Sequence, residues 1–431
     1  MLRTRPTARP FSIPRSALLL AVSVILSACA SVQTVGVPTP NTASSASATP
    51  TPDAATPAPV PPPAIPAGAL APEQFGAVGD GITDDTAALS ALFTHLNAAT
   101  PGSAAVSFAA GKVYAFHRTQ HCQFEITRED VTVYGNGATL KVMDDEPTDS
   151  PWFLVRIAAR HVAVIDLTVD ANRDQRPIMT DDQTQTSWFI DGGSRDVTLR
   201  GVRSVGAPLD GMYIRDLVST LPTTSADQYP TDIVLDHVEL LKSGRNNLSV
   251  ISSRNLHIVG GRFTGAHGVP GGPWAGIDIE PNRGADMQGN DGVTIDGAQT
   301  NDNLGSGIDV AQINNTNITI RNVDSHRNGT ALFLSPSGSI TVDGLRASGY
   351  DAVSKAGVIA IVPSDVPGAT VTLRNIEVSD STDSKPTFFQ NYSGRVSLDG
   401  LHATNVRTTT ILGTYQPTTV ANVFLDGVQI Q

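Results

Sequence analysis

The sequence predicts an all-β fold, a parallel β-helix of about twelve coils, because one short pattern recurs along most of the chain. The pattern reads apolar, variable, apolar, variable, usually Gly or Asn, apolar, and it occurs eleven times between Val131 and Val428 at spacings of 22 to 37 residues. Its period of two predicts a strand, and a second strand precedes each copy, as in AGIDIE from Ala275 and SGIDVA from Ser306. Strand pairs repeated at this spacing are typical of solenoids, in which each coil buries alternate residues in a continuous core.

Residues 1–28 predict a lipoprotein signal peptide. An Arg-bearing start is followed by an apolar run over residues 17–26 and then by the tetrad LSAC, which ends at Cys29. The tetrad resembles a bacterial lipobox, in which the Cys becomes the lipidated first residue of the mature protein. The resemblance implies an outer-membrane lipoprotein of the bacterial cell envelope, because no Asp follows Cys29. The alternative is an ordinary secretory signal with a chance Cys.

Residues 29–72 predict a tether rather than a folded domain. They are rich in Pro, Ala, Thr and Ser and carry almost no charge, a composition that cannot form a core. The β-helix domain is then expected over residues 73–431. Without the four Arg of the leader the chain has 25 basic residues (29 − 4) against 41 acidic ones, a net charge of −16, which argues against nucleic acid as a partner. Cys122 is the only other cysteine, so no intrachain disulfide framework is implied.

Residues 75–89, FGAVGDGITDDTAAL, predict the start of this domain. Gly79-Asp80-Gly81 is typical of a turn, Thr83 is expected to cap a helix, and Asp84 and Asp85 would lie in its first turn, where the helix dipole favours acidic side chains. An apolar stripe of Leu89, Leu92, Phe93 and Leu96 follows. We expect this helix to cover the open end of the β-helix, whose first coil would otherwise expose its core and its unpaired edge.

The same segment resembles the entry motif of the pectate-lyase-like superfamily of right-handed, single-stranded β-helices, in particular pectate lyase 3 and rhamnogalacturonase-like proteins. Together with the repeats, the resemblance covers the chain from Phe75 to its C-terminus. It implies a right-handed β-helix with an N-terminal capping helix. The superfamily includes polysaccharide lyases, glycoside hydrolases, uronate epimerases and phage tailspikes, so the resemblance leaves the function open.

The first strands of successive coils, aligned on their inward apolar residues, bring three carboxylates to one exposed, outward face. One outward column contains Tyr213, Ser249, Asp278, Asp309 and Phe333. The next column, two residues further on, contains Glu280. Neighbouring coils lie about 4.8 Å apart and residues i and i+2 about 6.5 to 7 Å apart, so these like charges should raise one pKa and provide both an acid and a base. The three residues are therefore candidate catalytic groups of a glycosidase, and the alternative is a solvated acidic face.

Long segments between the coils near these carboxylates supply candidate substrate contacts. Tyr and Trp can stack on sugar rings and Arg can pair with uronate carboxylates. The candidates are Tyr213, Arg215, Arg245, His267, Trp274, Asn282 and Arg283. Trp274 could equally anchor the Gly-rich loop that it ends.

The segment AGIDIEPN, residues 275–282, is also similar to the catalytic strand of mannuronan C5-epimerases, which reads Gly-aromatic-Asp-Pro-His. Asp278 matches the aspartate of that family, whereas Glu280 stands where the family has its His. A lyase would need a base to remove the C5 proton, and only Tyr213 or Arg245 is plausible here.

No metal site and no required cofactor are predicted, although the carboxylates could hold Ca²⁺. The segment DANRD from Asp170 resembles a calcium loop but has Gln175 where that loop needs Gly, and His117, His121 and Cys122 are weak candidate ligands. The sequence thus favours a surface-anchored enzyme that cleaves glycosidic bonds in an acidic, uronate-containing polysaccharide. The alternatives are a polysaccharide lyase, a uronate C5-epimerase or a non-catalytic polysaccharide-binding protein of the envelope, bound to the membrane only by its lipid.

Overall fold

The structure is a computed structural model. It describes residues 64–98, 104–144, 153–175, 186–216, 228–268, 272–281, 289–350, 357–362, 366–381, 389–391, 395–406 and 419–431. The predicted signal peptide with Cys29, most of the predicted tether, and Asn282 and Arg283 lie outside these residues. None of the helices in the described ranges has the length and apolar character needed to cross a membrane.

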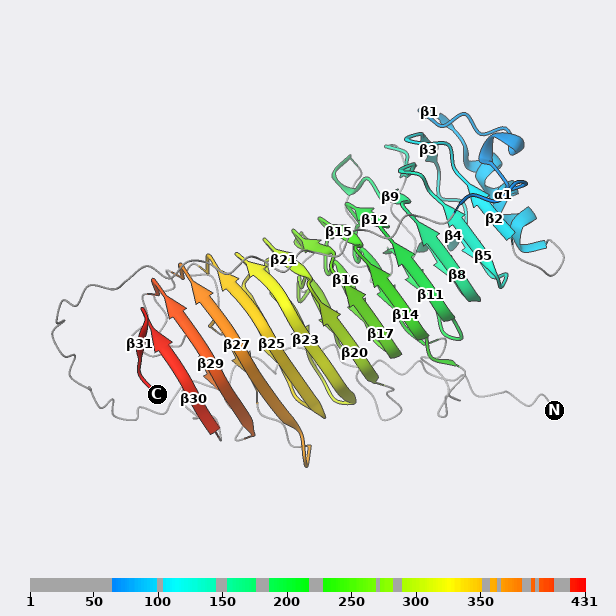
Figure 1. Cartoon of the computed structure of the whole chain (residues 1–431). Coiled ribbons are helices and arrows are strands. Elements are labelled where there is room, and N and C mark those ends of the chain that lie inside the picture. The colour runs from blue at the N-terminus through cyan, green and yellow to red at the C-terminus, as the bar shows by residue number, and fades with distance from the viewer. Residues whose placement is uncertain are drawn as a thin grey trace, which may run out of the picture. The chain divides into compact units, whose positions relative to one another are not determined.

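The described residues form a parallel β-helix, as the sequence predicts (Figure 1). Its strands pair in parallel with the strands one coil earlier and one coil later, and only the last two strands, β30 and β31, pair antiparallel. The first of its two sheets contains one strand from each successive coil: β4 Cys122–Ile126, β7 Phe153–Ile157, β10 Thr186–Ile190, β13 Met212–Ile214, β16 Leu248–Val250, β19 Ile277–Ile279, β22 Ser306–Val310, β24 Thr330–Leu334, β26 Ile359–Ile361 and β28 Phe389–Asn391.

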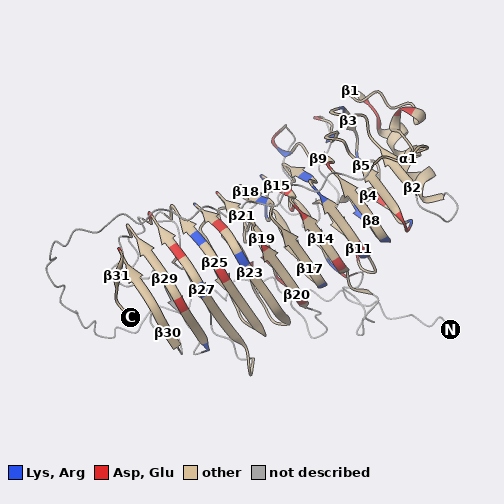
Figure 2. Ribbon diagram, viewed as in Figure 1, with Lys and Arg blue, Asp and Glu red and all other residues tan. Residues whose placement is uncertain are grey.

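The second sheet contains the recurring sequence pattern, and basic and acidic residues alternate across its neighbouring strands at Arg321, Asp343, Arg374 and Asp399 (Figure 2). Its strands are β1 Asp80–Asp84, β2 Ala104–Ser107, β3 Val113–Phe116, β5 Val131–Tyr134, β6 Thr139–Val142, β8 Arg160–Ile165, β9 Thr168–Asp170, β11 Arg195–Arg200, β12 Arg203–Val205, β14 Thr231–Asp236, β15 Glu239–Leu241, β17 Ser253–Val259, β18 Arg262–Thr264, β20 Asn290–Asp296, β21 Gln299–Asn301, β23 Asn315–His326, β25 Ser339–Ser348, β27 Thr370–Ser379, β29 Val396–Thr404, β30 Thr419–Leu425 and β31 Val428–Gln429.

The Gly or Asn of the pattern bends the chain between two segments of the second sheet. In every copy from Val162 onward this fifth residue has a positive φ, for example 60° at Gly201, between β11 and β12, and 53° at Asn322. Glycine adopts this left-handed conformation without steric penalty, and Asn tolerates it better than other side chains. In the Val131 copy the positive φ falls one residue later, at Asn136.

The inward residues of successive coils stack into one continuous core. Leu248, Ile277, Ile308 and Leu332 lie opposite one another on four neighbouring strands and have no exposed surface. Burying each such side chain stabilises the fold by about 1.5 to 3 kcal/mol. The core therefore holds each coil in register with the next, and register decides which side chains meet on the outer face.

The N-terminal helix α1, Thr86–Ala98, buries the predicted apolar stripe from Leu89 to Leu96. Its predicted start was wrong, because Thr83 lies in β1 and does not cap the helix. Asp84 Oδ1 instead accepts a hydrogen bond from the backbone N–H of Thr86 at 2.9 Å. Asp85 uses both carboxylate oxygens to accept the N–H groups of Val78 and Gly79, at 2.7 and 3.0 Å. The two aspartates thus fix the entry loop and the helix start together.

The end of the predicted tether already joins the domain. The backbone N–H of Leu70 donates to the carbonyl of Ala105 at 2.8 Å, and Leu70 forms a parallel bridge with Val106. A short 3-10 helix, η1 Pro72–Phe75, follows. The ordered domain therefore includes residues just before 73.

Candidate functional site

The structure places Asp278 and Asp309 directly opposite each other on neighbouring strands. Asp278 of β19 pairs with Ser249 of β16 on one side and with Asp309 of β22 on the other. Tyr213 and Phe333 continue the same column, so the predicted outward column is confirmed. Directly opposite side chains have their Cβ atoms about 4.5 to 5.5 Å apart.

The prediction that these carboxylates lie on an exposed face is wrong for Asp278. Asp278 is only 3% exposed and Ser249 is fully buried, although both side chains point away from the core. Asp309 and Glu280 are half-buried. The accessible part of the site therefore consists of Asp309 and Glu280, with Asp278 behind them.

Asn246 covers Asp278 from the turn that precedes β16. Its Nδ2 donates to Asp278 Oδ2 at 2.7 Å and to Ser249 Oγ at 3.0 Å. Its Oδ1 accepts the backbone N–H of Ala275 at 2.9 Å. Because a backbone N–H can only donate, this contact fixes the orientation of the amide and directs its N–H groups toward Asp278.

Arg245 is held in an ion pair with a buried carboxylate that the sequence analysis did not identify. Arg245 Nε donates to Asp210 Oδ1 at 2.9 Å and Nη2 donates to Asp210 Oδ2. Burial lowers the pKa of Arg245, but the Asp210 carboxylate more than offsets this effect, so the pKa lies above its usual range. Arg245 is therefore not a base, and the hypothesis that it could remove a C5 proton was wrong.

Electrostatics around the two aspartates favour the protonated form. The Oδ1 atoms of Asp278 and Asp309 are buried and accept no hydrogen bond from the described residues. Burial, followed by the charges of Asp309 and Glu280, raises the pKa of Asp278 well above its usual value, and Arg245 opposes this rise. Burial and the charge of Glu280 raise the pKa of Asp309 to about 8. The pair titrates as a unit and retains a proton at neutral pH.

Glu280 is the third carboxylate of the site. Gln312 Nε2 donates to Glu280 Oε1 at 2.7 Å and so orients the carboxylate. Glu280 follows Asp278 by two residues and is therefore a diagonal neighbour of Asp309. Diagonal neighbours in a sheet have their residue positions about 7 to 8 Å apart, so Glu280 and Asp309 can act on the same substrate.

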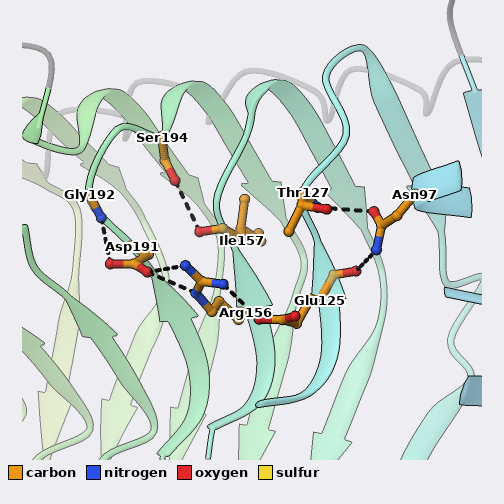
Figure 3. Close-up of polar contacts among 8 residues, drawn as sticks. All are labelled: Asn97, Glu125, Thr127, Arg156, Ile157, Asp191, Gly192 and Ser194. Atoms are coloured by element: carbon orange, nitrogen blue, oxygen red, sulfur yellow. Dashed lines mark hydrogen bonds and ion pairs between the residues drawn. The ribbon is translucent and has the colours of Figure 1, made fainter. Parts of the chain in front are cut away.

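A second charged cluster on the same sheet shows how this fold normally places charges (Figure 3). Arg156 of β7 lies opposite Glu125 of β4, and its Nη1 donates to Glu125 Oε1 at 2.6 Å. Its Nε donates to Asp191 Oδ2 at 2.8 Å. Opposite charges face each other there, whereas Asp278 faces Asp309. Like charges placed directly opposite each other destabilise a sheet, so this pair is a candidate functional site.

Tyr213 and Arg215 lie together at one end of the carboxylate column. The guanidinium carbon of Arg215 is 6.0 Å from the ring centroid of Tyr213, and both side chains are half-buried. Arg215 Nε also donates to the backbone carbonyl of Asp216 at 3.3 Å. The two side chains could offer a ring and a cation to one sugar residue.

No protein-family model matches the chain, and no match was found among curated proteins. Among solved structures, the chain is similar to the A-module of a mannuronan C-5 epimerase from Azotobacter vinelandii, with a TM-score of 0.57 and 17% identity over 82% of this chain and 100% of that chain. A hyperthermoactive exopolygalacturonase from Thermotoga maritima is similar with a TM-score of 0.52 and 15% identity, over 86% of this chain and 94% of that chain. A surface adhesin of Streptococcus pneumoniae is similar with a TM-score of 0.52 and 12% identity, over 83% of this chain and 90% of that chain.

The chain therefore has the parallel β-helix fold of these proteins. At these identities the similarity concerns the fold. Its neighbours include two enzymes and an adhesin, so the fold by itself does not distinguish catalysis from binding. The function has to be argued from the side chains.

His267 and Trp274 lie in the loop that leads from β18 to β19 of this β-helix. The carbonyl of exposed His267 accepts Nη1 of Arg173, in the short helix η2 Arg173–Gln175, at 2.9 Å. Trp274 is half-buried with a φ of 51°, and its carbonyl accepts the N–H of Gly305 at 3.0 Å. These backbone contacts place both residues, and their contact with substrate stays a prediction.

The weaker metal candidates gain no support from the geometry. Within the described ranges, no group of three or more His, Cys, Asp and Glu side chains is arranged to hold a metal ion. Burial raises the pKa of the Cys122 thiol to about 11, which disfavours the thiolate that a metal would need.

The sequence analysis missed Asp210 and Asn246 and gave Ser249 and Gln312 no role. Asp210 and Asn246 stand two residues before Met212 and Leu248, which lie opposite each other. The alignment that predicted the carboxylate column also stacks these two residues when it is extended by two positions. The signal was present, but it lay just before the strands.

Proposed function

We propose that this chain hydrolyses glycosidic bonds in an acidic, uronate-containing polysaccharide. The observation that carries the proposal is a half-buried Asp309 whose pKa is raised to about 8, beside a second carboxylate and opposite a third. A carboxyl group that stays protonated at neutral pH next to an ionised one is the combination that glycoside hydrolysis needs.

Each carboxylate has a distinct role in this mechanism. Asp309 donates its proton to the leaving glycosidic oxygen, and Glu280, oriented by Gln312, removes a proton from the attacking water. Asp278 touches neither reactant, because it is buried behind them, and burial together with the charge of Glu280 keeps Asp309 protonated. Because Glu280 activates a water rather than forming a bond to the sugar, the proposed reaction inverts the anomeric carbon.

The substrate class rests on two supports. Arg215 beside Tyr213 offers a cation and a ring to a uronate residue. Two proteins of the same fold are named a mannuronan C-5 epimerase and an exopolygalacturonase.

We further propose that the protein is lipidated at Cys29 and works at the surface of a bacterial outer membrane. Labelling of the expressed protein with a radioactive fatty acid tests this anchor, and Cys29→Ala should abolish the label.

The test is mass spectrometry of the products after incubation with mannuronan, polygalacturonan and neutral polysaccharide controls in ¹⁸O-water. Fragments that carry one added ¹⁸O are expected, and proton NMR should show the inverted anomer first. Asp309→Asn and Glu280→Gln should each lower kcat at least about 100-fold, the usual contribution of a general acid or base. Asp196→Asn, at an exposed aspartate, is the matched control and should leave the rate unchanged.

Other outcomes would replace the proposal. Unsaturated fragments that absorb in the ultraviolet would identify a lyase, and intact polymer with altered C5 configuration would identify an epimerase. Intact polymer that is retained in a pull-down, equally by the wild type and by Asp309→Asn, would identify a binding protein.

A further inference from the structure

Asp210 is a buried carboxylate that the proposed mechanism does not use. Its side chain is 1% exposed and lies in the turn before β13, one coil away from Asn246. Besides the ion pair with Arg245, its Oδ1 accepts the backbone N–H of Asn246 at 3.1 Å. A single carboxylate thus fixes both the cation and the main chain from which the Asn246 side chain extends.

Asn246 has one orientation that satisfies its contacts. It is 1% exposed, and its Oδ1 is occupied by the N–H of Ala275, so Nδ2 must face Ser249 and Asp278. Its main chain is held on the other side by Asp210. The side chain is therefore clamped between two neighbouring coils and cannot turn away from Asp278 without leaving buried polar groups unpaired.

The aspartate pair is supported unequally. Asp278 accepts a hydrogen bond from the Asn246 amide and lies near the charge of Arg245. The buried Oδ1 of Asp309 accepts no hydrogen bond from the described residues. A donor to a carboxylate stabilises the ionised form. The groups that act on Asp278 are Asp309 on β22, Glu280 after β19, and Arg245 with Asp210 in the preceding turns.

We propose that Asn246, clamped by Asp210 and Ala275, is a positioning residue that stabilises the negative charge of the Asp278–Asp309 pair and leaves the proton for Asp309 to deliver. Asp210 acts through Asn246 and Arg245, and both Asp210 and Asn246 are buried too deeply to touch the substrate. The inference deepens the proposed function and rests on it for its catalytic meaning, but the contacts on which it depends involve the aspartate pair alone.

The test compares two adjacent buried asparagines. Asn246 faces outward to Asp278, whereas Asn247 faces the core, where its Nδ2 donates to Asn303 Oδ1 at 3.0 Å. Asn246→Ala removes a donor to a carboxylate, so the pair should release its last proton at a pH about one unit higher. Asn247→Ala should lower stability without moving that titration. Asn246→Ser, which keeps a hydroxyl donor, should restore part of the shift and provides a folded variant if the alanine variant unfolds.

Two readouts separate this inference from the proposed function. Carbon-13 NMR of labelled aspartate follows the titration of the pair directly in the full-length protein and needs no substrate. On an active enzyme, the basic limb of the pH profile of kcat/KM should move by the same amount. If NMR shows equal titration in the wild type and in Asn246→Ala and Asn246→Ser, the positioning role is wrong even if the enzyme is a hydrolase. If NMR shows the shift and no polysaccharide is cleaved, the positioning role stands and the proposed function fails.

Discussion

At the scale of single residues, the candidate site contains a like-charge contact that the same sheet avoids elsewhere. Arg156 lies three coils before Ser249, which stacks with Asp278 and Asp309. In the Arg156 cluster each charged side chain pairs with one of opposite charge, because Arg156 contacts both Glu125 and Asp191. Asp278 is buried and Asp309 is half-buried beside it, and one buried oxygen of each accepts no hydrogen bond from the described residues. Such a pair persists in a folded protein at the expense of stability, and proton transfer is a function that gives it a reason to persist.

Replacing Asp309 with Asn should therefore stabilise the protein in a pH-dependent way. The pKa of Asp309 is about 8 in the folded protein and is near its ordinary value of about 4 when the chain is unfolded. The wild type accordingly has its full stability below about pH 4 and loses stability as the pH rises through about 8, because the folded state holds a proton that the unfolded state releases.

The Asp309→Asn variant should not lose stability in this way as the pH rises, because its amide does not ionise. Its free energy of unfolding should exceed that of the wild type by about 1 to 3 kcal/mol at pH 8, and the difference should vanish near pH 4. Urea denaturation at the two pH values measures it. The exposed-residue variant Asp196→Asn should show no such pH-dependent gain. A difference that is equal at both pH values would mean that the effect is one of packing rather than of charge.

Which residues of the site could be predicted follows from their place in the repeat. Asp278 and Asp309 lie within strands and Glu280 directly follows one, so the period of two fixes their side-chain directions and their meeting was predicted correctly. Arg245 and Asp210 lie in turns, where no period applies, so their ion pair and its effect on Arg245 were not foreseen. The burial of Asp278 depends on Asn246, which also lies in a turn.

At the scale of elements, the left-handed bends of the second sheet are linked from coil to coil by side-chain hydrogen bonds. Asn322 Nδ2 donates to Asp296 Oδ1 at 2.9 Å, and Asn375 and Asn422 make equivalent contacts with Asp343 and Asp399 in the preceding coil. Asp296 also accepts Nε of Arg321 at 2.9 Å. These aspartates therefore join neighbouring coils. Asn fits the pattern because it supplies a donor and also tolerates a positive φ.

The bend at Asn322 predicts an order of stability among variants. Asn322→Gly loses the hydrogen bond to Asp296 but keeps the left-handed backbone, as at Gly344 in the next coil. Asn322→Ala also loses the hydrogen bond, and its Cβ strains the left-handed backbone. Its free energy of unfolding should therefore be about 1 kcal/mol lower than that of the glycine variant. Urea unfolding measures the series, with Thr319→Ala on the same strand as a control. Equal stabilities for the alanine and glycine variants would show that the bend itself imposes no constraint.

Helix α1 shows the limit of prediction for elements. The apolar stripe located the helix correctly, since its spacing depends only on the chain itself. The helix start was misplaced by a few residues because β1 pairs with β3 through Asp80 and Asp84, a contact between segments about thirty residues apart that local cap preferences do not reveal.

At the scale of the whole molecule, the fold could be predicted because a β-helix is stabilised by contacts between adjacent coils. Val371 lies opposite Val396, and Ile376 lies opposite Leu401, so each coil repeats the apolar positions of the one before it. A repeat in sequence then becomes a repeat in space. The turns between the two sheets have no common length, and the cover over Asp278 comes from them.

This modular stacking predicts that one whole coil can be removed. Deleting residues 371–395, which are 25 residues (395 − 371 + 1), joins Thr370 to Val396 and puts Val396 in the place of its partner Val371. The apolar residues of β29 then continue the core of β25, and Asp278 and Asp309 are untouched. The variant should fold cooperatively with reduced stability and with the far-ultraviolet circular dichroism of the parent.

The matched control removes one residue fewer. Deleting residues 371–394 joins Thr370 to Arg395, so Arg395 and Ser397 take the inward places of Val371 and Leu373, while Val396 and Leu398 turn outward. Because the side-chain period of a strand is two, this single-residue slip exposes the apolar face and buries the polar one. Size-exclusion chromatography and urea unfolding should show a compact, cooperative protein for the 25-residue deletion and an aggregated or unfolded one for the 24-residue deletion. Equal behaviour of the two would mean that coil-to-coil register does not govern the stability of this β-helix.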